Sequence, residues 1–155
     1  MKRWICLLLT AILLCGFGCV EPQSAKEPDA AYAQRVAAEW REKGFLTDMA
    51  SYSDEDLLDY YGIDVSACIC AAGFADAVGY TDEAVVAVAD EAMAKEIEAL
   101  LSDHLEAVKA SFRSYDPDAL KIAEDAVLLR EGGVVLLIVS PNAQAMLEAF
   151  RTVQP

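Results

Sequence analysis

Few residues in this chain have side chains suited to catalysis or metal binding, and His104 is the only histidine. It lies in a helical pattern, three residues after Leu101 and four before Val108. One histidine does not make a metal site, and no nearby serine or cysteine forms a recognisable nucleophilic pair with it. We therefore expect His104 to be a structural residue at the edge of a buried helix face.

Cys68 and Cys70 form a Cys-x-Cys pair, which on a β-strand would point both thiols to one face. A soft metal ion needs more ligands than these two, and a disulfide across one residue strains the bond geometry. We interpret both as small, weakly hydrophobic buried residues. A redox or metal-binding role and a strained or intermolecular disulfide remain as alternatives.

Two acidic clusters lie where helices are expected to begin, Asp54-Glu55-Asp56 and Asp116-Pro117-Asp118. Neither has the ligand spacing or the central glycine of a calcium loop, so we assign both to helix capping. The chain has no G-x-S-x-G elbow, no phosphate-binding glycine loop and no H-E-x-x-H motif. We therefore predict no catalytic residue, no metal and no cofactor.

The start of the chain has the composition of a secretory signal. Lys2 and Arg3 precede an apolar stretch over residues 5–14, and small residues follow before a boundary. After Cys19 the sequence becomes polar and contains proline, as a tether does. Spanning a bilayer takes about 20 apolar residues, which is more than this run supplies, so we expect a cleaved signal.

Residues 16–19, Gly-Phe-Gly-Cys, resemble the lipobox of bacterial lipoproteins, although Gly16 stands where that pattern prefers Leu. The resemblance implies cleavage after Gly18 and a lipid on Cys19, which would anchor the protein at the outer face of the cytoplasmic membrane. An uncleaved anchor and plain secretion are the alternatives, and both also place the body outside the cytoplasm. The expected organisation is a signal peptide at 1–18, a polar tether at 19–28 and one domain at 29–155.

The chain is acidic, with 12 Lys and Arg against 26 Asp and Glu and a formal charge of −14. Loss of Lys2 and Arg3 with the signal would take this charge to −16, because two positive charges leave. Such a charge argues against nucleic acid as a partner, since binding phosphates needs a basic surface. It also keeps the domain off an anionic lipid surface, so the membrane contact would run through Cys19 alone.

Hydrophobic patterns in the body predict an α+β fold: a small antiparallel or mixed sheet of about four strands, with a long helix and shorter helices packed on it. The long helix would run about six turns from Asp90 to Phe112, with apolar residues on one stripe. Other helices are expected at 29–43, at 53–61 and after Ser140, and strands at 68–74, 84–89, 123–130 and 134–139.

Short motifs in a fixed order resemble a family of small lipoproteins from Gram-positive bacteria, the domain of unknown function 4358. They are Leu57-Leu58, Tyr60-Tyr61-Gly62-Ile63, Asp82-Glu83, Phe112 with Tyr115 and Pro117, and Gly132-Gly133 leading into residues 134–140. The resemblance covers residues 53–151 and implies an extracytoplasmic location and this fold, but no chemistry, because the family has no assigned activity. His104 stands where similar chains are expected to carry Arg or Lys.

These features favour a non-catalytic lipoprotein that binds a protein or ligand of the cell envelope. The alternative is an envelope hydrolase that uses carboxylates without a motif, since the chain has 26 acidic residues. A pocket holding at least two buried acids of raised pKa would favour the hydrolase. A solute-binding component of a transporter is a third hypothesis, for which the chain is short.

Overall fold

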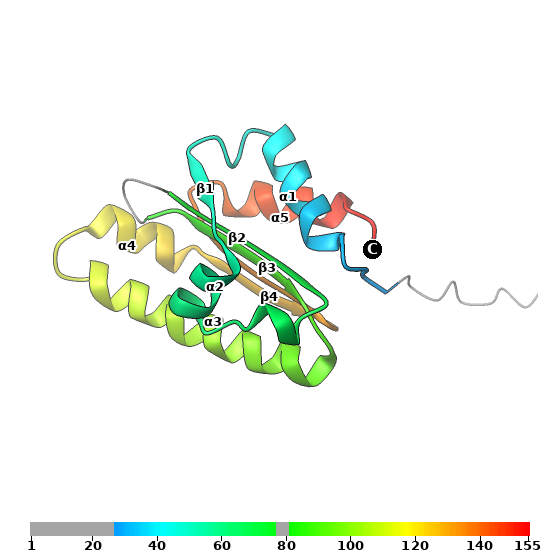
Figure 1. Cartoon of the computed structure of the whole chain (residues 1–155). Helices are drawn as coiled ribbons and strands as arrows, with labels where there is room; N and C mark the ends of the chain where they lie inside the picture. Colours follow the sequence, from blue (N-terminus) through cyan, green and yellow to red (C-terminus); the bar gives the residue numbers. More distant parts are fainter. Residues whose placement is uncertain (1–26, 77–80) are drawn as a thin grey trace, which may run out of the picture.

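The computed structural model describes residues 27–76 and 81–155, so Cys19 and the expected signal peptide lie outside the described residues. These ranges form five α-helices, one 3₁₀ turn and one five-stranded sheet (Figure 1). In chain order the elements are α1 Tyr32–Glu42, β1 Met49–Ser51, α2 Asp54–Tyr61, the 3₁₀ turn Val65–Ala67, β2 Cys70–Asp76, β3 Glu83–Val88, α3 Glu91–Phe112, α4 Pro117–Glu124, β4 Val127–Glu131, β5 Val134–Val139 and α5 Ala143–Thr152.

The sheet has the strand order β1-β2-β3-β5-β4, and every neighbouring pair is antiparallel. This confirms the α+β class and settles the sheet as antiparallel. It has five strands rather than about four, because β1 adds a three-residue edge strand. A strand that short has too few residues to show an alternating pattern, so the sequence did not reveal it.

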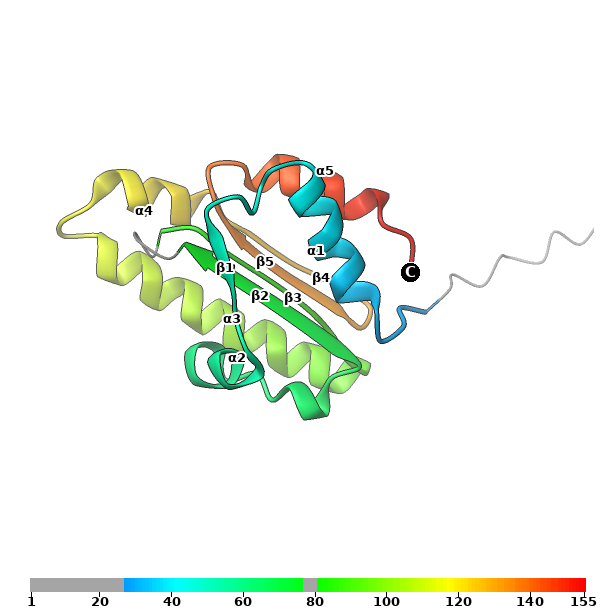
Figure 2. The ribbon, with the colours of Figure 1, turned by 45° about the horizontal axis from the view of Figure 1, so that its top comes forward.

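Helices cover both faces of the sheet: α1 and α5 lie on one face, and α2, α3 and α4 on the other (Figures 1 and 2). Along β3, Val86 and Val88 face the first layer, whereas Val85 and Ala87 face the second. Strand β5 alternates in the same way. The predicted continuous burial of residues 84–89 is therefore confirmed, since an apolar run without polar gaps suits a strand covered on both sides.

Two expected strand boundaries were wrong. Ala123 belongs to α4, and the following strand begins only at Val127. The helix forms because Asp116 accepts a hydrogen bond from the Ala119 amide at 2.9 Å and Pro117 suits the first turn. Likewise Cys68 ends the 3₁₀ turn, and β2 begins at Cys70.

Helix capping explains both acidic clusters, as expected. The Ser53 hydroxyl accepts from the Asp56 amide, and the Asp56 carboxylate accepts from the Ser53 amide at 2.8 Å, which is a complete capping box. Asp116 caps α4. Across residues 27–76 and 81–155, no helix has both the length and the apolar composition needed to cross a bilayer.

Candidate functional site

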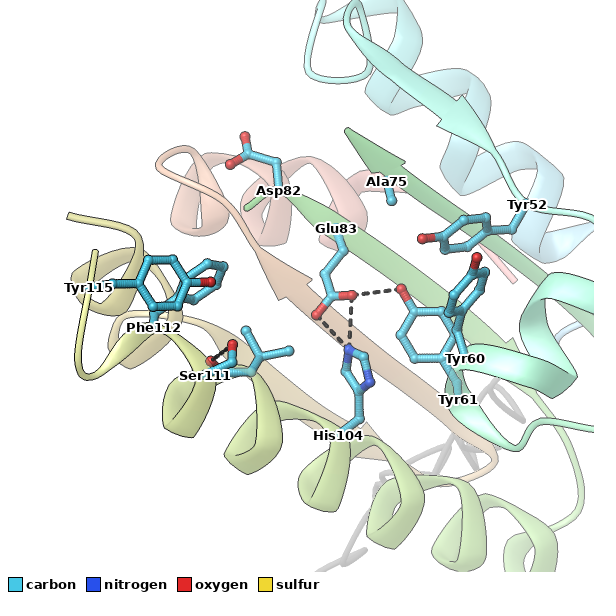
Figure 3. Close-up of a pocket in the computed structure, with 11 residues that line it drawn as sticks. Tyr52, Tyr60, Tyr61, Ala75, Asp82, Glu83, His104, Ser111, Phe112 and Tyr115 are labelled. Atoms are coloured by element: carbon cyan, nitrogen blue, oxygen red, sulfur yellow. Dashed lines mark hydrogen bonds and ion pairs between the residues drawn. The ribbon is translucent and has the colours of Figure 1, made fainter. Parts of the chain in front are cut away.

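A cavity of about 290 Å³ lies where α2 and the C-terminal half of α3 meet the start of β3 (Figure 3). Its walls come from segments that are distant in the chain. The lining residues are Tyr52, Tyr60, Tyr61, Ala75, Asp82, Glu83, His104, Val108, Ser111, Phe112 and Tyr115. We refer to this cavity as the tyrosine pocket.

Helix α3 supplies one wall of the tyrosine pocket from a single face. His104, Val108, Ser111 and Phe112 follow one another at spacings of four, three and one, which is the repeat of one helix face. Leu101 and Leu105 on the adjoining face are buried against the sheet. The buried face therefore fixes the rotation of α3, and that rotation turns the His104 face toward β3.

Small residues in β2 make room for the opposite wall. Ala75 pairs with Glu83 across the sheet, and Gly73 lies two residues earlier on the same face. A Cβ atom at Gly73 would lie 2.6 Å from Leu57 Cδ2 and 3.2 Å from Tyr52 Cδ2. Because no side chain intervenes at Gly73, α2 and Tyr52 pack directly on the sheet.

Glu83 is held between two helices at the centre of the site. Its carboxylate lies 2.9 Å (Oε1) and 3.0 Å (Oε2) from His104 Nε2, and Tyr61 donates its hydroxyl hydrogen to Oε2 at 2.7 Å. Only 13% of the Glu83 side chain and 22% of the His104 side chain are exposed. His104 therefore fixes a carboxylate in the pocket, a more specific role than the expected edge of a buried helix face.

Tyr61 acts as a permanent donor in this cluster. Burial, together with the negative charge of Glu83, raises the pKa of the Tyr61 phenol far above its usual value. The phenol therefore keeps its proton for Glu83. The Tyr61 ring also packs against the His104 ring, with 4.6 Å between centroids.

Two groups of aromatic rings form the sides of the tyrosine pocket, and they lie on opposite sides of Glu83 in Figure 3. Tyr52 and Tyr60 stack with centroids 5.3 Å apart, and Phe112 and Tyr115 meet at 5.8 Å. Tyr60 is 57% exposed and Tyr115 is 70% exposed, so these two rings form the rim. The arrangement is a carboxylate between aromatic walls that open to solvent.

Asp82 also lines the tyrosine pocket but does not pair with Glu83. Burial raises the pKa of the Asp82 carboxyl; a hydrogen bond from the Ser140 hydroxyl at 3.4 Å opposes this effect, and the charge of Asp76 adds to it. In Figure 3 the Asp82 and Glu83 carboxyl groups point away from each other. The two acids therefore do not form an acid–base pair in this structure.

Replacing Asp82 with asparagine is expected to stabilise the domain at neutral pH, by about 1 kcal/mol or less because Asp82 is partly solvated. The raised pKa means that the folded state binds the Asp82 proton more tightly than the unfolded state does. The stability of the native chain therefore falls as pH rises from the ordinary aspartate value through the folded pKa.

Urea unfolding of the native chain and Asp82→Asn between pH 3 and 7 checks this prediction. The advantage of the variant should grow with pH through that window and then level off. An advantage that is constant across the whole range would contradict an origin in Asp82 ionisation.

The two cysteines lie on opposite sides of the sheet, so the expected common face was wrong. Cys68 packs with the α3 layer, whereas Cys70 packs with the α1 layer and its thiol contacts the Asp29 carbonyl oxygen at 3.5 Å. Both are free thiols and half-buried, and burial raises the pKa of Cys68. Within the described ranges, no group of three or more His, Cys, Asp or Glu residues is arranged to hold a metal ion.

The sequence analysis singled out His104, but it named Glu83 and the aromatic residues only as motifs of the family resemblance and did not predict that they meet. The available signal was an acidic residue at the first position of an otherwise apolar strand. A second signal was the concentration of tyrosines at positions 52, 60 and 61. Neither signal indicates that the two segments meet.

Comparison with known families places the site in context. The sequence model of one family, described as Domain of unknown function (DUF4358), matches residues 42–140. This range contains every residue that lines the tyrosine pocket. No curated protein and no solved structure matches the chain.

Proposed function

Because the chain belongs to the family described as Domain of unknown function (DUF4358), whose match spans the tyrosine pocket, we propose a function from the geometry of that pocket. The protein is a non-catalytic binding domain, lipid-anchored through Cys19 on the outer face of the cytoplasmic membrane. Its ligand is a small organic molecule. The observation that carries this proposal is a cavity with five aromatic side chains around a fixed carboxylate.

The chemistry of the lining residues favours binding over catalysis. The Ser111 hydroxyl donates its hydrogen to the Val108 carbonyl oxygen at 2.7 Å, in its own helix turn. Glu83 accepts hydrogen bonds from Tyr61 and His104, so its contacts with these two side chains hold it in place. The envelope hydrolase remains the alternative because burial raises the pKa of the Asp82 carboxyl group. A hydrolase of this kind uses a pair of carboxyl groups, and that of Asp82 does not face Glu83 (Figure 3).

The position of the tether supports access of a ligand to the pocket. Glu27 and Pro28, the first described residues, lie beside Gly132 and Gly133. The Gly133 carbonyl oxygen accepts a hydrogen bond from the Ala89 amide at 2.9 Å, and Ala89 directly follows β3. Glu27 and Pro28 therefore lie near the C-terminal end of β3. Glu83 begins the same strand, about 20 Å away at ~3.3 Å per residue. The pocket therefore lies at the far end of the sheet from the tether.

Ligand-observed NMR with a library of neutral, anionic and cationic fragments tests the proposed function on the full-length protein in detergent micelles. We expect a group of fragments to bind and to lose about tenfold in affinity in Tyr115→Ala, which removes a ring from the rim. Tyr115 is exposed, so the variant should fold normally.

Leu58→Ala is the matched control. Leu58 is 51% exposed and lies on α2, outside the pocket lining. If Tyr115→Ala and Leu58→Ala weaken binding equally, or if neither weakens it, the result would argue against the tyrosine pocket as the binding site.

A further inference from the structure

The charge balance of the tyrosine pocket selects the kind of ligand it can hold. Its described lining contains two carboxylates, Asp82 and Glu83, and neither Lys nor Arg; His104 is the single basic side chain there. An anionic ligand would bring its charge next to these acids in a partly buried site, where screening by water is weak. A cationic ligand would be attracted.

Glu83 has spare capacity to accept hydrogen bonds. An ionised carboxylate offers about four lone-pair positions. His104 Nε2–H is shared between both oxygens, and the Tyr61 hydroxyl uses one further position on Oε2. Oε1 therefore keeps a lone-pair position that can accept from a donor on a ligand, while His104 and Tyr61 hold the carboxylate in place.

The aromatic walls suit the same ligand. Ring faces attract cations through the electrostatic quadrupole of the π system, and they also bury an apolar body. The Tyr52–Tyr60 stack and the Phe112–Tyr115 pair flank the carboxylate from opposite sides (Figure 3). A metal ion fits less well, since no set of three His, Cys, Asp or Glu ligands gathers in the described parts of the chain.

We propose that the tyrosine pocket binds a small organic ammonium ion, with its N–H donors on Glu83 and its apolar body between the two aromatic walls. This inference rests on the proposed function, because it assigns a ligand class to the same pocket. Because the ligand must donate an N–H hydrogen to Glu83, a primary amine should bind more tightly than a quaternary ammonium ion of similar size.

Three probes of nearly equal shape test the ligand class by titration calorimetry on the full-length protein in micelles. They are phenethylamine, phenethyl alcohol and phenylacetate, which are cationic, neutral and anionic near pH 7. We expect phenethylamine to bind at least about tenfold more tightly than the alcohol, and phenylacetate not to bind measurably. Adding salt should weaken the binding of the amine and leave that of the alcohol unchanged.

Glu83→Gln is the decisive variant because it removes the charge and keeps the size and an acceptor for the Tyr61 hydroxyl. It should weaken phenethylamine binding about tenfold and leave the alcohol unaffected. Should this variant fail to fold, Tyr115→Ala provides the second measurement and should weaken both probes. Leu58→Ala again serves as the control, with no change expected for either probe.

The outcomes separate this inference from the proposed function. Equal affinity for the amine and the alcohol, with both weakened by Tyr115→Ala, would overturn the ammonium ligand and leave a ligand-binding pocket. The ammonium ligand would also be overturned if phenethylamine does not bind and the fragments whose affinity falls in Tyr115→Ala are neutral or anionic. No binding by these probes or by any fragment in the library would overturn both.

Discussion

Replacing Cys19 with alanine is expected to abolish lipid anchoring, so that the protein accumulates as an unprocessed precursor or appears in the medium. The reason is that the Cys19 thiol would carry the lipid, and without it the acidic domain would be repelled by an anionic membrane. Fractionation of cells into membrane, soluble and medium fractions measures the change, with the size of the mature chain read by mass spectrometry.

Cys15→Ala is the matched control for this experiment, because it removes a neighbouring thiol four residues before Cys19. It should be processed and retained like the native chain. Unchanged processing and unchanged membrane retention in Cys19→Ala would contradict the lipid anchor.

Trp40→Ala is expected to cost about 3–5 kcal/mol of the free energy of unfolding, the usual loss when a large buried aromatic is truncated. Trp40 is fully buried in the layer that α1 and α5 form over the sheet. Its indole N–H donates to the Met146 carbonyl oxygen at 2.9 Å, which connects the two helices. A loss of this size is a large part of the stability of a domain, typically about 5–15 kcal/mol.

Chemical unfolding followed by circular dichroism measures this loss. Trp40→Phe retains most of the volume but removes the donor, so it should cost less, about 1–3 kcal/mol, for the lost hydrogen bond to the Met146 carbonyl oxygen and the smaller ring. Tyr115→Ala, at an exposed position, should change stability little. A loss below about 1 kcal/mol in Trp40→Ala would mean that the α1–α5 layer contributes little to the fold.

The central part of the fold was predictable because its signals are local. The apolar runs at residues 84–89 and 134–139 lie next to each other in the sheet as β3 and β5, and both are covered on both faces. The helix expected from Asp90 to Phe112 is α3, which spans 22 residues. In each case the burial pattern repeats within one segment, so the segment alone indicates its structure.

The missed strand β1 and the misplaced boundary at α4 have a common cause. Strand β1 is three residues long, and α4 replaced the start of an expected strand. In both regions the apolar residues are too few to distinguish a strand from a helix, and pairing with β2 or a cap at Asp116 decides between them.

The sequence by itself determined the α+β class, the two central strands, the long helix and the acidic character of the domain. It also identified His104 as the histidine to examine. Only the tertiary structure decided what His104 does, because its partner Glu83 lies 21 residues away on β3 and the Tyr61 donor lies 22 residues from Glu83 on α2. Three features together bring the residues of this site into contact: the rotation of α3, the register of β3 and the absence of a side chain at Gly73. These are packing relations between segments, and they leave no periodic pattern within any one of them.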